Sequence, residues 1–204
     1  MIRLALICLA AAALALSSAP VAAAQWAGDN QRQAAASVSL DDLSHTTWIA
    51  DGRDDAPRKV YVFLDANCIY CAKFWADARP WVDSGKVQLR YLLVAVIAPT
   101  SGGKAATLLA DPDPAARLAA YERAHAFGVE RMLRGGPHAS MQDASLMPTP
   151  VSGDVAHALA ANEGLLNAFN LRGTPGLVFR GLDGRPVAIG GIPADGLEGV
   201  FGAR

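Results

Sequence analysis

An apolar run rich in β-branched and aromatic residues ends directly before two closely spaced cysteines. Residues 59–65 (Lys-Val-Tyr-Val-Phe-Leu-Asp) have the composition of a buried strand, and Cys68 and Cys71 follow in a Cys-Ile-Tyr-Cys motif. A helical pattern extends from this motif to about Asp83, and residues 87–97 form a second apolar run typical of a strand buried on both faces. Two strands joined by a helix predict a right-handed β-α-β unit with parallel strands. The cysteine pair is therefore expected at a strand-to-helix junction.

The second half of the chain predicts more helices and a closing hairpin. From about 104 to 170, helical patterns are interrupted by prolines and glycines, which we interpret as a helical insertion with an irregular loop at 134–153. Residues 177–180 and 186–189 flank an Asp-Gly turn signal and predict a β-hairpin. A short helix is expected from about Ala194. Alternating strands and helices of this kind predict an α/β domain.

The sequence Gly173-Thr174-Pro175 precedes this hairpin. A Cys-x-x-Cys pair at a strand-to-helix junction, with a later X-Pro leading into a strand, is the layout of a thioredoxin-like redox site. Most X-Pro bonds are trans, but in this context we expect the Thr174–Pro175 bond to be cis. Backbone left unpaired there could bind an extended substrate segment beside Cys68. The predicted fold over residues 39–204 is thioredoxin-like, with a helical insertion.

The first turn of a helix gives the two cysteines different roles. Cys68 faces unpaired backbone N–H groups and the positive end of the helix dipole, which favour the thiolate and lower its pKa from about 8.5. We expect Cys68 to be the exposed nucleophile and Cys71, one turn further along, to be the resolving thiol. Stabilising the thiolate also stabilises the dithiol, so the disulfide becomes a better oxidant. The residues expected to bind substrate are Ile69, Tyr70, Thr174 and Pro175.

Two simpler interpretations of the cysteine pair involve no catalysis. A structural disulfide that closes so short a loop would add only about 2 kcal/mol in the chain-entropy model. A closed zinc site needs four ligands, and the histidines are scattered without a second pair at ligand spacing (His45, His125, His138 and His157). We therefore favour redox exchange, with no metal and no cofactor. Asp65 is interpreted as a structural carboxylate at the start of the helix in preference to a proton acceptor.

The first 24 residues have the order of a secretory signal peptide. A positive start is followed by the uncharged run 4–16 and by small residues that suit cleavage after Ala24. The run is shorter than the roughly 20 residues that span a bilayer, and Cys8 lies inside it, not at the end where a lipidated cysteine would stand. Cleavage leaves two cysteines in a compartment where disulfides persist. Residues 25–38 are expected to be a flexible segment.

Size and charge exclude several kinds of partner. After cleavage roughly 180 of the 204 residues remain, which fits one domain with a hydrophobic core. The formal net charge is −1 and no block of Lys or Arg is present, so nucleic acid has little electrostatic reason to bind. No other apolar stretch is long enough to predict a membrane anchor.

Beyond the cysteine motif, the sequence resembles a known family. Residues 78–90 (Ala-Arg-Pro-Trp-Val-Asp-Ser-Gly-Lys-Val-Gln-Leu-Arg), with Phe74-Trp75 before them, look like the DsbG branch of the DsbC/DsbG thiol:disulfide interchange proteins. Residues 48–52, 61–63 and 92–94 resemble the same branch. The resemblance runs from about Leu40 to the C-terminus and is weakest between 134 and 153. It implies a thioredoxin domain with a helical insertion, in agreement with the pattern above.

The resemblance also implies roles at matching positions. Cys68 corresponds to the attacking cysteine, Cys71 to the resolving cysteine, and Thr174-Pro175 to a Thr followed by a cis-Pro. It implies misoxidised or sulfenylated protein thiols as substrates, the bacterial periplasm as the location, and a membrane electron donor of the DsbD type as a partner.

Two departures from the family pattern bear on function. Ile69-Tyr70 stands where the relatives usually carry Pro-Tyr, which restores a backbone N–H near the thiolate. Few residues remain between the predicted cleavage site and the helix expected at Ser39, so the family's N-terminal dimerisation domain and linker are expected to be absent and the protein to be a monomer.

These observations predict a periplasmic thiol:disulfide oxidoreductase that acts on protein disulfides or cysteine sulfenic acids, as a reductase or exchange enzyme. A monomeric dithiol oxidase is one alternative. The other is a periplasmic chaperone or assembly factor whose thiols are dispensable, suggested by the apolar Ile69, Tyr70 and the loop 141–147.

Overall fold

The computed structural model describes residues 39–142, 145–191 and 194–204. The predicted signal peptide and the segment 25–38 lie outside the described residues. Within those residues, no helix has both the length and the apolar character that a membrane crossing requires.

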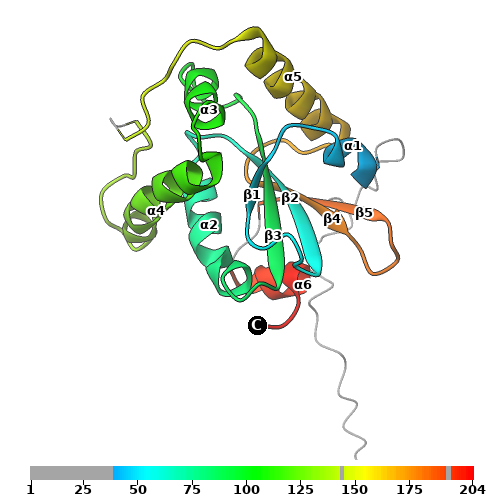
Figure 1. Cartoon of the computed structure of the whole chain (residues 1–204). Helices are drawn as coiled ribbons and strands as arrows, with labels where there is room; N and C mark the ends of the chain where they lie inside the picture. The colour runs from blue at the N-terminus through cyan, green and yellow to red at the C-terminus, as the bar shows by residue number, and fades with distance from the viewer. Residues whose placement is uncertain (1–38, 143–144, 192–193) are drawn as a thin grey trace, which may run out of the picture.

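Five strands form one mixed sheet in the order β1-β3-β2-β4-β5 (Figure 1). The central strands β2 and β3 are parallel, with Val60 opposite Leu89, and every other neighbouring pair is antiparallel. The parallel pair confirms the β-α-β unit predicted around the cysteine motif. The bounds are Ile49–Asp51 for β1, Arg58–Leu64 for β2, Val87–Leu93 for β3, Gly176–Arg180 for β4 and Pro186–Gly190 for β5.

Helices cover both faces of this sheet (Figure 1). The connecting helix α2 and the long helix α4 pack against each other on one face, and α1 with the C-terminal end of α5 lies on the other. Helices α3, α4 and α5 fall between β3 and β4 and constitute the predicted helical insertion. The bounds are Leu40–Ser44 for α1, Ile69–Val82 for α2, Ser101–Leu109 for α3, Pro114–Leu133 for α4, Gly153–Ala168 for α5, Ala194–Gly196 for the 3-10 helix η1 and Leu197–Phe201 for α6.

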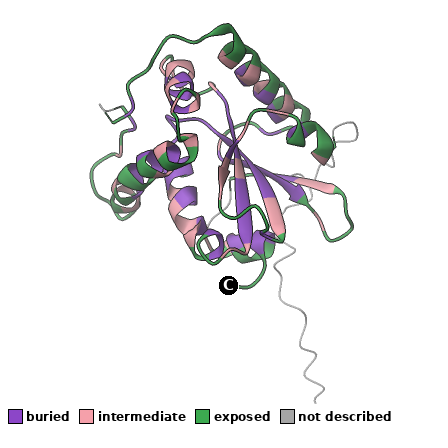
Figure 2. Ribbon diagram, viewed as in Figure 1, coloured by how far each residue is buried: buried purple, intermediate pink, exposed green. Residues whose placement is uncertain are grey.

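The central strand β2 supplies side chains to two hydrophobic cores. Val60, Val62 and Leu64 join the larger core with α2 and α4, whereas Tyr61 and Phe63 join the smaller core with α1 and α5. All five are at most 5% exposed, and Figure 2 shows β2 and β3 buried over most of their length. Full burial of each such side chain contributes about 1.5–3 kcal/mol. Burial on both faces explains why the strand reads as a continuous apolar run.

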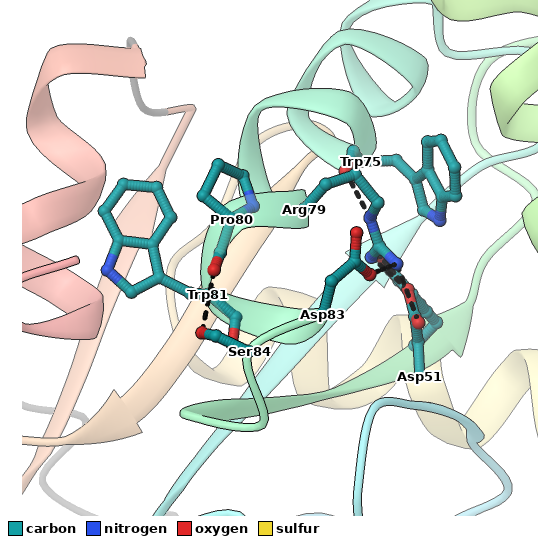
Figure 3. Close-up of polar contacts among 8 residues, drawn as sticks. Asp51, Trp75, Arg79, Pro80, Trp81, Asp83 and Ser84 are labelled. Carbon is teal, nitrogen blue, oxygen red and sulfur yellow. Dashed lines mark hydrogen bonds and ion pairs between the residues drawn. The ribbon is translucent and has the colours of Figure 1, made fainter.

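Arg79 links the C-terminal half of α2 to β1 through an ion pair with Asp51. Its guanidinium donates hydrogen bonds to both carboxylate oxygens of Asp51, at 3.1 Å from Nη1 to Oδ1 in one of them, and its Nε–H donates to the Trp75 carbonyl at 3.1 Å (Figure 3). The same group lies over the Trp75 ring, 4.3 Å from the centroid. Paired charge-assisted bonds are among the stronger polar contacts, so this contact holds the helix in position on the sheet.

The turn after α2 returns the chain to β3. The Ser84 hydroxyl donates to the Pro80 carbonyl at 2.8 Å (Figure 3), and Gly85 adopts a φ of 76°. A Cβ at Gly85 would also lie 2.8 Å from the Arg53 side chain. The Ser-Gly pair ends the helix because glycine adopts this left-handed conformation without steric cost.

Two elements differ from the prediction. Strand β1 was not predicted because its three residues are too few to show a periodicity, and only Ile49 among them is buried. Strand β3 ends at Leu93, not at residue 97. The backbone N–H groups of Val96 and Ile97 donate to the Asp65 carboxylate, so a side chain replaces the neighbouring strand as their partner.

Candidate active site

Three residues separate the end of β2 from the Cys-Ile-Tyr-Cys motif, which begins α2. Cys68 is the N-cap residue and has an extended backbone, with φ −86° and ψ 106°. Its N–H donates to the Asp65 carbonyl at 2.9 Å, and its carbonyl accepts from the Cys71 N–H at 3.0 Å. Both cysteines are free thiols. The structure therefore presents a dithiol on the first turn of a helix, where the sequence predicted it.

The loop before β4 lies against the first of these thiols. The Thr174–Pro175 bond is cis, as predicted. The Cys68 thiol donates to the Thr174 carbonyl oxygen, with 3.1 Å between Sγ and O. The Thr174 hydroxyl is buried and has no hydrogen-bond partner, so it is available to donate to a sulfur that becomes negatively charged.

The expectation of an exposed nucleophile is wrong. Cys68 is only 3% exposed and Cys71 is completely buried. The sulfur of Cys68 is directed at the Thr174 carbonyl, which takes the place of solvent on that side. A thiolate has no proton to donate, so ionisation of Cys68 breaks this contact and frees the sulfur for attack.

The pKa of Cys68 is lowered from its ordinary value of 9.0 to about 7. The largest cause is a hydrogen bond from the Cys71 thiol, and burial opposes it. Smaller contributions come from the Thr174 hydroxyl, which can donate to the sulfur once it is charged, and from the backbone N–H groups of Cys71 and Tyr70 at the helix N-terminus. The predicted direction is confirmed, with the partner thiol as a larger cause than the helix terminus.

Burial raises the pKa of Cys71 well above its ordinary value, and the charges of Cys68 and Glu122 raise it further. Around neutral pH, Cys68 therefore carries the negative charge and Cys71 keeps its proton. One thiol is prepared for attack and the other is held in reserve, which is the division of roles that a two-step exchange requires.

Asp65 organises the turn between β2 and the motif. Its Oδ1 accepts from the Asn67 N–H at 2.8 Å and from the Ser101 hydroxyl at 2.7 Å. Its Oδ2 accepts from the N–H groups of Val96 at 2.8 Å and Ile97 at 2.9 Å. The carboxylate is completely buried, and its oxygens are occupied by fixed donors. This arrangement supports the structural interpretation of Asp65 over a proton acceptor.

Asn67 connects the motif to the helical insertion. Its Nδ2 donates to the hydroxyl oxygens of Thr100 at 3.1 Å and Ser101 at 2.9 Å. Its Oδ1 accepts from the side-chain amide of Gln142, in the loop between α4 and α5. The residue directly before Cys68 is thus fixed by two segments of the insertion.

The residues predicted to bind substrate differ in exposure. Tyr70 is 55% exposed, Ile69 and Thr174 are half-buried, and Pro175 is buried. Val96 and Ile97, whose amides bind Asp65, add exposed apolar side chains that the sequence did not single out, at 47% and 50%. Exposed apolar side chains are therefore contributed by α2 and by the segment after β3, which is bound to Asp65.

The sequence also gave no indication of a buried polar cluster on α3 and α4. Lys104 is 1% exposed and donates to the Tyr121 hydroxyl at 2.8 Å and to the Met141 carbonyl. The Tyr121 hydroxyl in turn donates to the Ala66 carbonyl at 2.7 Å, two residues before Cys68. Glu122 is completely buried, and neither carboxyl oxygen has a hydrogen-bond partner. In sequence, these charges resemble the exposed charges of an ordinary helix.

His125 is buried on α4, with Nδ1 2.7 Å from the Tyr121 carbonyl. His45, His138 and His157 are not buried. In the described ranges, no three His, Cys, Asp or Glu side chains gather into a group that could hold a metal ion.

No family model matches the chain, but two curated proteins do. It is 38% identical over 163 residues to the thiol:disulfide interchange protein DsbG of Pseudomonas aeruginosa, covering 79% of this chain and 58% of that protein. It is 42% identical over 137 residues to the DsbG of Escherichia coli, covering 67% of this chain and 49% of that protein. The chain thus spans about half the length of the curated relatives it matches.

Solved structures show the same fold. Proteus mirabilis ScsC in a transitional conformation matches with a TM-score of 0.59 at 18% identity, over 83% of this chain and 79% of that one. A periplasmic thioredoxin-like protein from Salmonella enterica serovar Typhimurium matches with a TM-score of 0.55 at 17% identity, over 76% and 87%. The fold is therefore thioredoxin-like, as predicted. Over the residues that it shares with the curated relatives, the chain is a homologue of the DsbG thiol:disulfide interchange proteins.

Proposed function

We propose that the chain is a thiol:disulfide oxidoreductase that acts on protein substrates through Cys68 and Cys71. The observation that carries this proposal is the division between the two thiols. The pKa of Cys68 is lowered to about 7, whereas the pKa of Cys71 is raised by burial. Homology to DsbG proteins supports the same class of reaction.

The proposed reaction proceeds through a mixed disulfide. The Cys68 thiolate attacks one sulfur of a substrate disulfide, a bond forms between them, and the other substrate sulfur leaves as a thiolate that takes up a proton. Cys71 then loses its proton and attacks the Cys68 sulfur, which releases the second substrate thiolate. The substrate gains two electrons and the protein ends as the Cys68–Cys71 disulfide, so a dithiol reductant must restore it.

The same pair of thiols would reduce a cysteine sulfenic acid. Cys68 attacks the sulfenic sulfur, the hydroxyl leaves as water after taking up a proton, and the mixed disulfide is resolved by Cys71 as before. One oxidised sulfur is reduced per turnover, and the products are one substrate thiol, one water and the oxidised protein.

Substrate binding is proposed at Tyr70, Ile97 and the Thr174 carbonyl. In the dithiol form this carbonyl accepts a hydrogen bond from the Cys68 thiol. Once Cys68 is a thiolate or part of a mixed disulfide, the carbonyl is free to accept an N–H from an extended substrate segment. Attack and backbone recognition would therefore become possible together.

We place the reaction in the periplasm, after export by residues 1–24. A reductase in an oxidising compartment needs a supply of electrons from outside it, and a membrane donor of the DsbD type would provide one. The monomeric state remains a prediction, which size-exclusion chromatography with light scattering tests.

The redox state of the pair in the periplasm tests the direction of electron flow. Cells are quenched with acid, thiols are alkylated with a mass-tagging reagent, and the Cys68→Ser variant provides the marker for a chain with a single thiol. Mostly reduced protein is expected of a reductase. Mostly oxidised protein would contradict that role and favour the dithiol oxidase.

A chaperone or assembly factor is the second candidate, because Tyr70, Val96 and Ile97 expose apolar surface. A Cys68→Ala, Cys71→Ala double variant separates the two functions. If it kept full activity in cells that lack the wild-type protein, the thiols would be dispensable and the oxidoreductase would be the wrong proposal.

A further inference from the structure

Glu122 stands on the face of α4 that packs into the core of the molecule. Leu118 and Ala126, one turn before and one turn after it, belong to the same hydrophobic core as Cys68 and Cys71. Helix α4 packs against α2, which contains Cys71 and has Cys68 as its N-cap residue. Glu122 is therefore a carboxyl group directed into the apolar layer that contains the dithiol.

This carboxyl group lacks the partners of a structural acid. Both of its oxygens are buried without a hydrogen bond, whereas the buried carboxylate of Asp65 accepts from four donors. An unsatisfied buried polar group costs about 1–3 kcal/mol, more when it is charged. A glutamate at such a cost, where leucine or methionine would pack, calls for a chemical reason.

The ionisable groups around Glu122 come from three elements. Burial raises the pKa of Glu122 well above its usual range, the Cys68 charge on α2 raises it further, and the Lys104 ammonium on α3 lowers it. Glu122 in turn raises the pKa of Cys71 on α2 and of Tyr91 on β3. A negative charge on Cys68 therefore disfavours ionisation of Glu122, and negative charges on Cys68 and Glu122 disfavour ionisation of Cys71.

The proposed exchange reaction creates a need for a base at this place. Cys71 must lose a proton before it can attack the mixed disulfide, yet it is completely buried and its pKa is raised. Water cannot readily take that proton in an apolar layer. A general base within the layer would meet the need. Glu122, on the helix that packs against α2, is near enough for its charge to raise the pKa of Cys71.

We propose that Glu122 accepts the proton of Cys71 during resolution of the mixed disulfide. The inference rests on the proposed function. The Cys71 S–H bond breaks, its proton passes to the Glu122 carboxylate, the Cys71 sulfur bonds to the Cys68 sulfur, and the substrate sulfur leaves with the electron pair of the mixed disulfide bond. Glu122 then passes its proton to the leaving substrate thiolate.

The order of charges suits this role. While Cys68 is a thiolate, its charge disfavours ionisation of Glu122. When Cys68 forms the mixed disulfide that charge disappears, so the pKa of Glu122 falls at the step in which a base is required, while burial, the larger cause, still raises it. Lys104 stays nearby and favours the carboxylate. Formation of the mixed disulfide therefore shifts Glu122 toward the carboxylate form that resolution requires.

The test separates the two steps by stopped-flow absorbance. Reduced protein is mixed with a substoichiometric amount of the chromogenic disulfide dithiobis(nitrobenzoate). Attack by Cys68 releases one thionitrobenzoate, and resolution by Cys71 releases the second. Glu122→Gln is expected to leave the first phase near its wild-type rate and to slow the second by at least about tenfold at neutral pH, the low end of general-base effects. The slowed phase should then accelerate with pH as solvent hydroxide replaces the carboxylate.

Glu130→Gln is the matched control, because Glu130 lies on the same helix but is partly exposed and pairs with Lys73 and Arg134. It should change neither phase. Lys104→Met provides a second test that keeps Glu122. The loss of the positive charge should raise the pKa of Glu122 and slow the second phase at neutral pH, with recovery at higher pH.

A purely structural role predicts a different result. Glu122→Gln would then lower the unfolding temperature and leave the second phase and its pH profile unchanged, which would overturn the inference. If wild-type protein showed no first phase, Cys68 would not be a nucleophile and the proposed function itself would fail. A normal first phase with an unaltered second phase in Glu122→Gln would reject only the role of Glu122.

Discussion

The Cys68 thiol donates a hydrogen bond to the Thr174 carbonyl oxygen, which lies 106 residues later in the chain, with 3.1 Å between sulfur and oxygen. This contact joins the start of α2 to the loop before β4 and covers the sulfur in the dithiol form. It requires the proton of Cys68, so it is lost when the thiol ionises. The pKa of Cys68, about 7, therefore sets the pH at which the nucleophile is released from its cover.

The first prediction concerns the origin of this lowered pKa. The Cys71 thiol is the largest cause that lowers the pKa of Cys68, so Cys71→Ala should raise it from about 7 toward 9.0. The pH dependence of alkylation by iodoacetamide measures this directly, because only the thiolate reacts. A variant whose titration midpoint stayed near 7 would show that the helix terminus and Thr174 suffice.

The second prediction concerns the stability of the two redox forms. The folded-state pKa of Cys68 is depressed below the unfolded value, so its contribution to the stability of the reduced protein is full above pH 9 and is lost as pH falls through about 7. The disulfide form has no such thiol. Between pH 7 and 9 the reduced form should gain stability over the oxidised form by about 2 kcal/mol.

Urea unfolding of both forms at a series of pH values measures this difference. The expected gain in stability is limited to pH values up to about 9. Above pH 9, the raised pKa of Cys71 favours the unfolded state and lowers the stability of the reduced form. A stability difference that stayed constant from pH 7 to 9 would contradict the assigned pKa of Cys68.

The third prediction concerns the turn before the motif. In Asp65→Asn an amide NH₂ replaces an oxygen that accepts from backbone N–H groups, for example those of Val96 and Ile97. Donors then face donors in a buried site, so the variant should lose about 2–3 kcal/mol of unfolding free energy. It should also disturb the position of Cys68, whose N–H bonds the Asp65 carbonyl. Chemical unfolding measures the loss, and an Asp183→Asn variant at the exposed β4–β5 turn is the control.

The fourth prediction tests the anchor of α2. The side chains of Arg79 and Asp51 are 20% and 16% exposed. Arg79→Ala removes the paired contact between them and leaves the Asp51 carboxylate mostly buried without it. The expected loss is about 2 kcal/mol of unfolding free energy. Arg53→Ala is the matched control, since its ion pair with Asp55 is about 70% exposed and surface pairs contribute little. Equal losses in the two variants would refute the importance of the Arg79 contact.

The predictable parts of the fold are those with a local signal. The strand at 59–65 was recognised because both of its faces are buried, and the cis bond at Thr174–Pro175 because its context is specific. Strand β1 left no such signal, since its pairing with Arg90 and Tyr91 of β3 is decided by tertiary packing.

The same limit applies to the candidate site. The two-residue spacing of Cys68 and Cys71 identifies them as a pair from the sequence alone, because it places both cysteines on the first turn of the predicted helix. The burial of Glu122 depends on the way α4 packs on α2. This packing cannot be inferred from the residues of α4 alone. The cover over Cys68 likewise arises from a contact between distant segments, so its low exposure could not be foreseen from the motif.

The last prediction separates recognition of a protein substrate from chemistry at sulfur. Tyr70 and Ile97 are at least half exposed near the dithiol. The side chain of neither residue contributes to the lowered pKa of Cys68. A Tyr70→Ser, Ile97→Ser double variant should therefore react with the small disulfide dithiobis(nitrobenzoate) at the wild-type rate. Its kcat/KM for a disulfide-bonded protein substrate should fall about tenfold, because burial of two apolar side chains against the substrate is worth a few kcal/mol at most. Leu182→Ser is the control, since Leu182 is fully exposed in the β4–β5 turn. A parallel loss of both activities would place the two residues in the chemistry of Cys68, and no loss with the protein substrate would place the docking surface elsewhere.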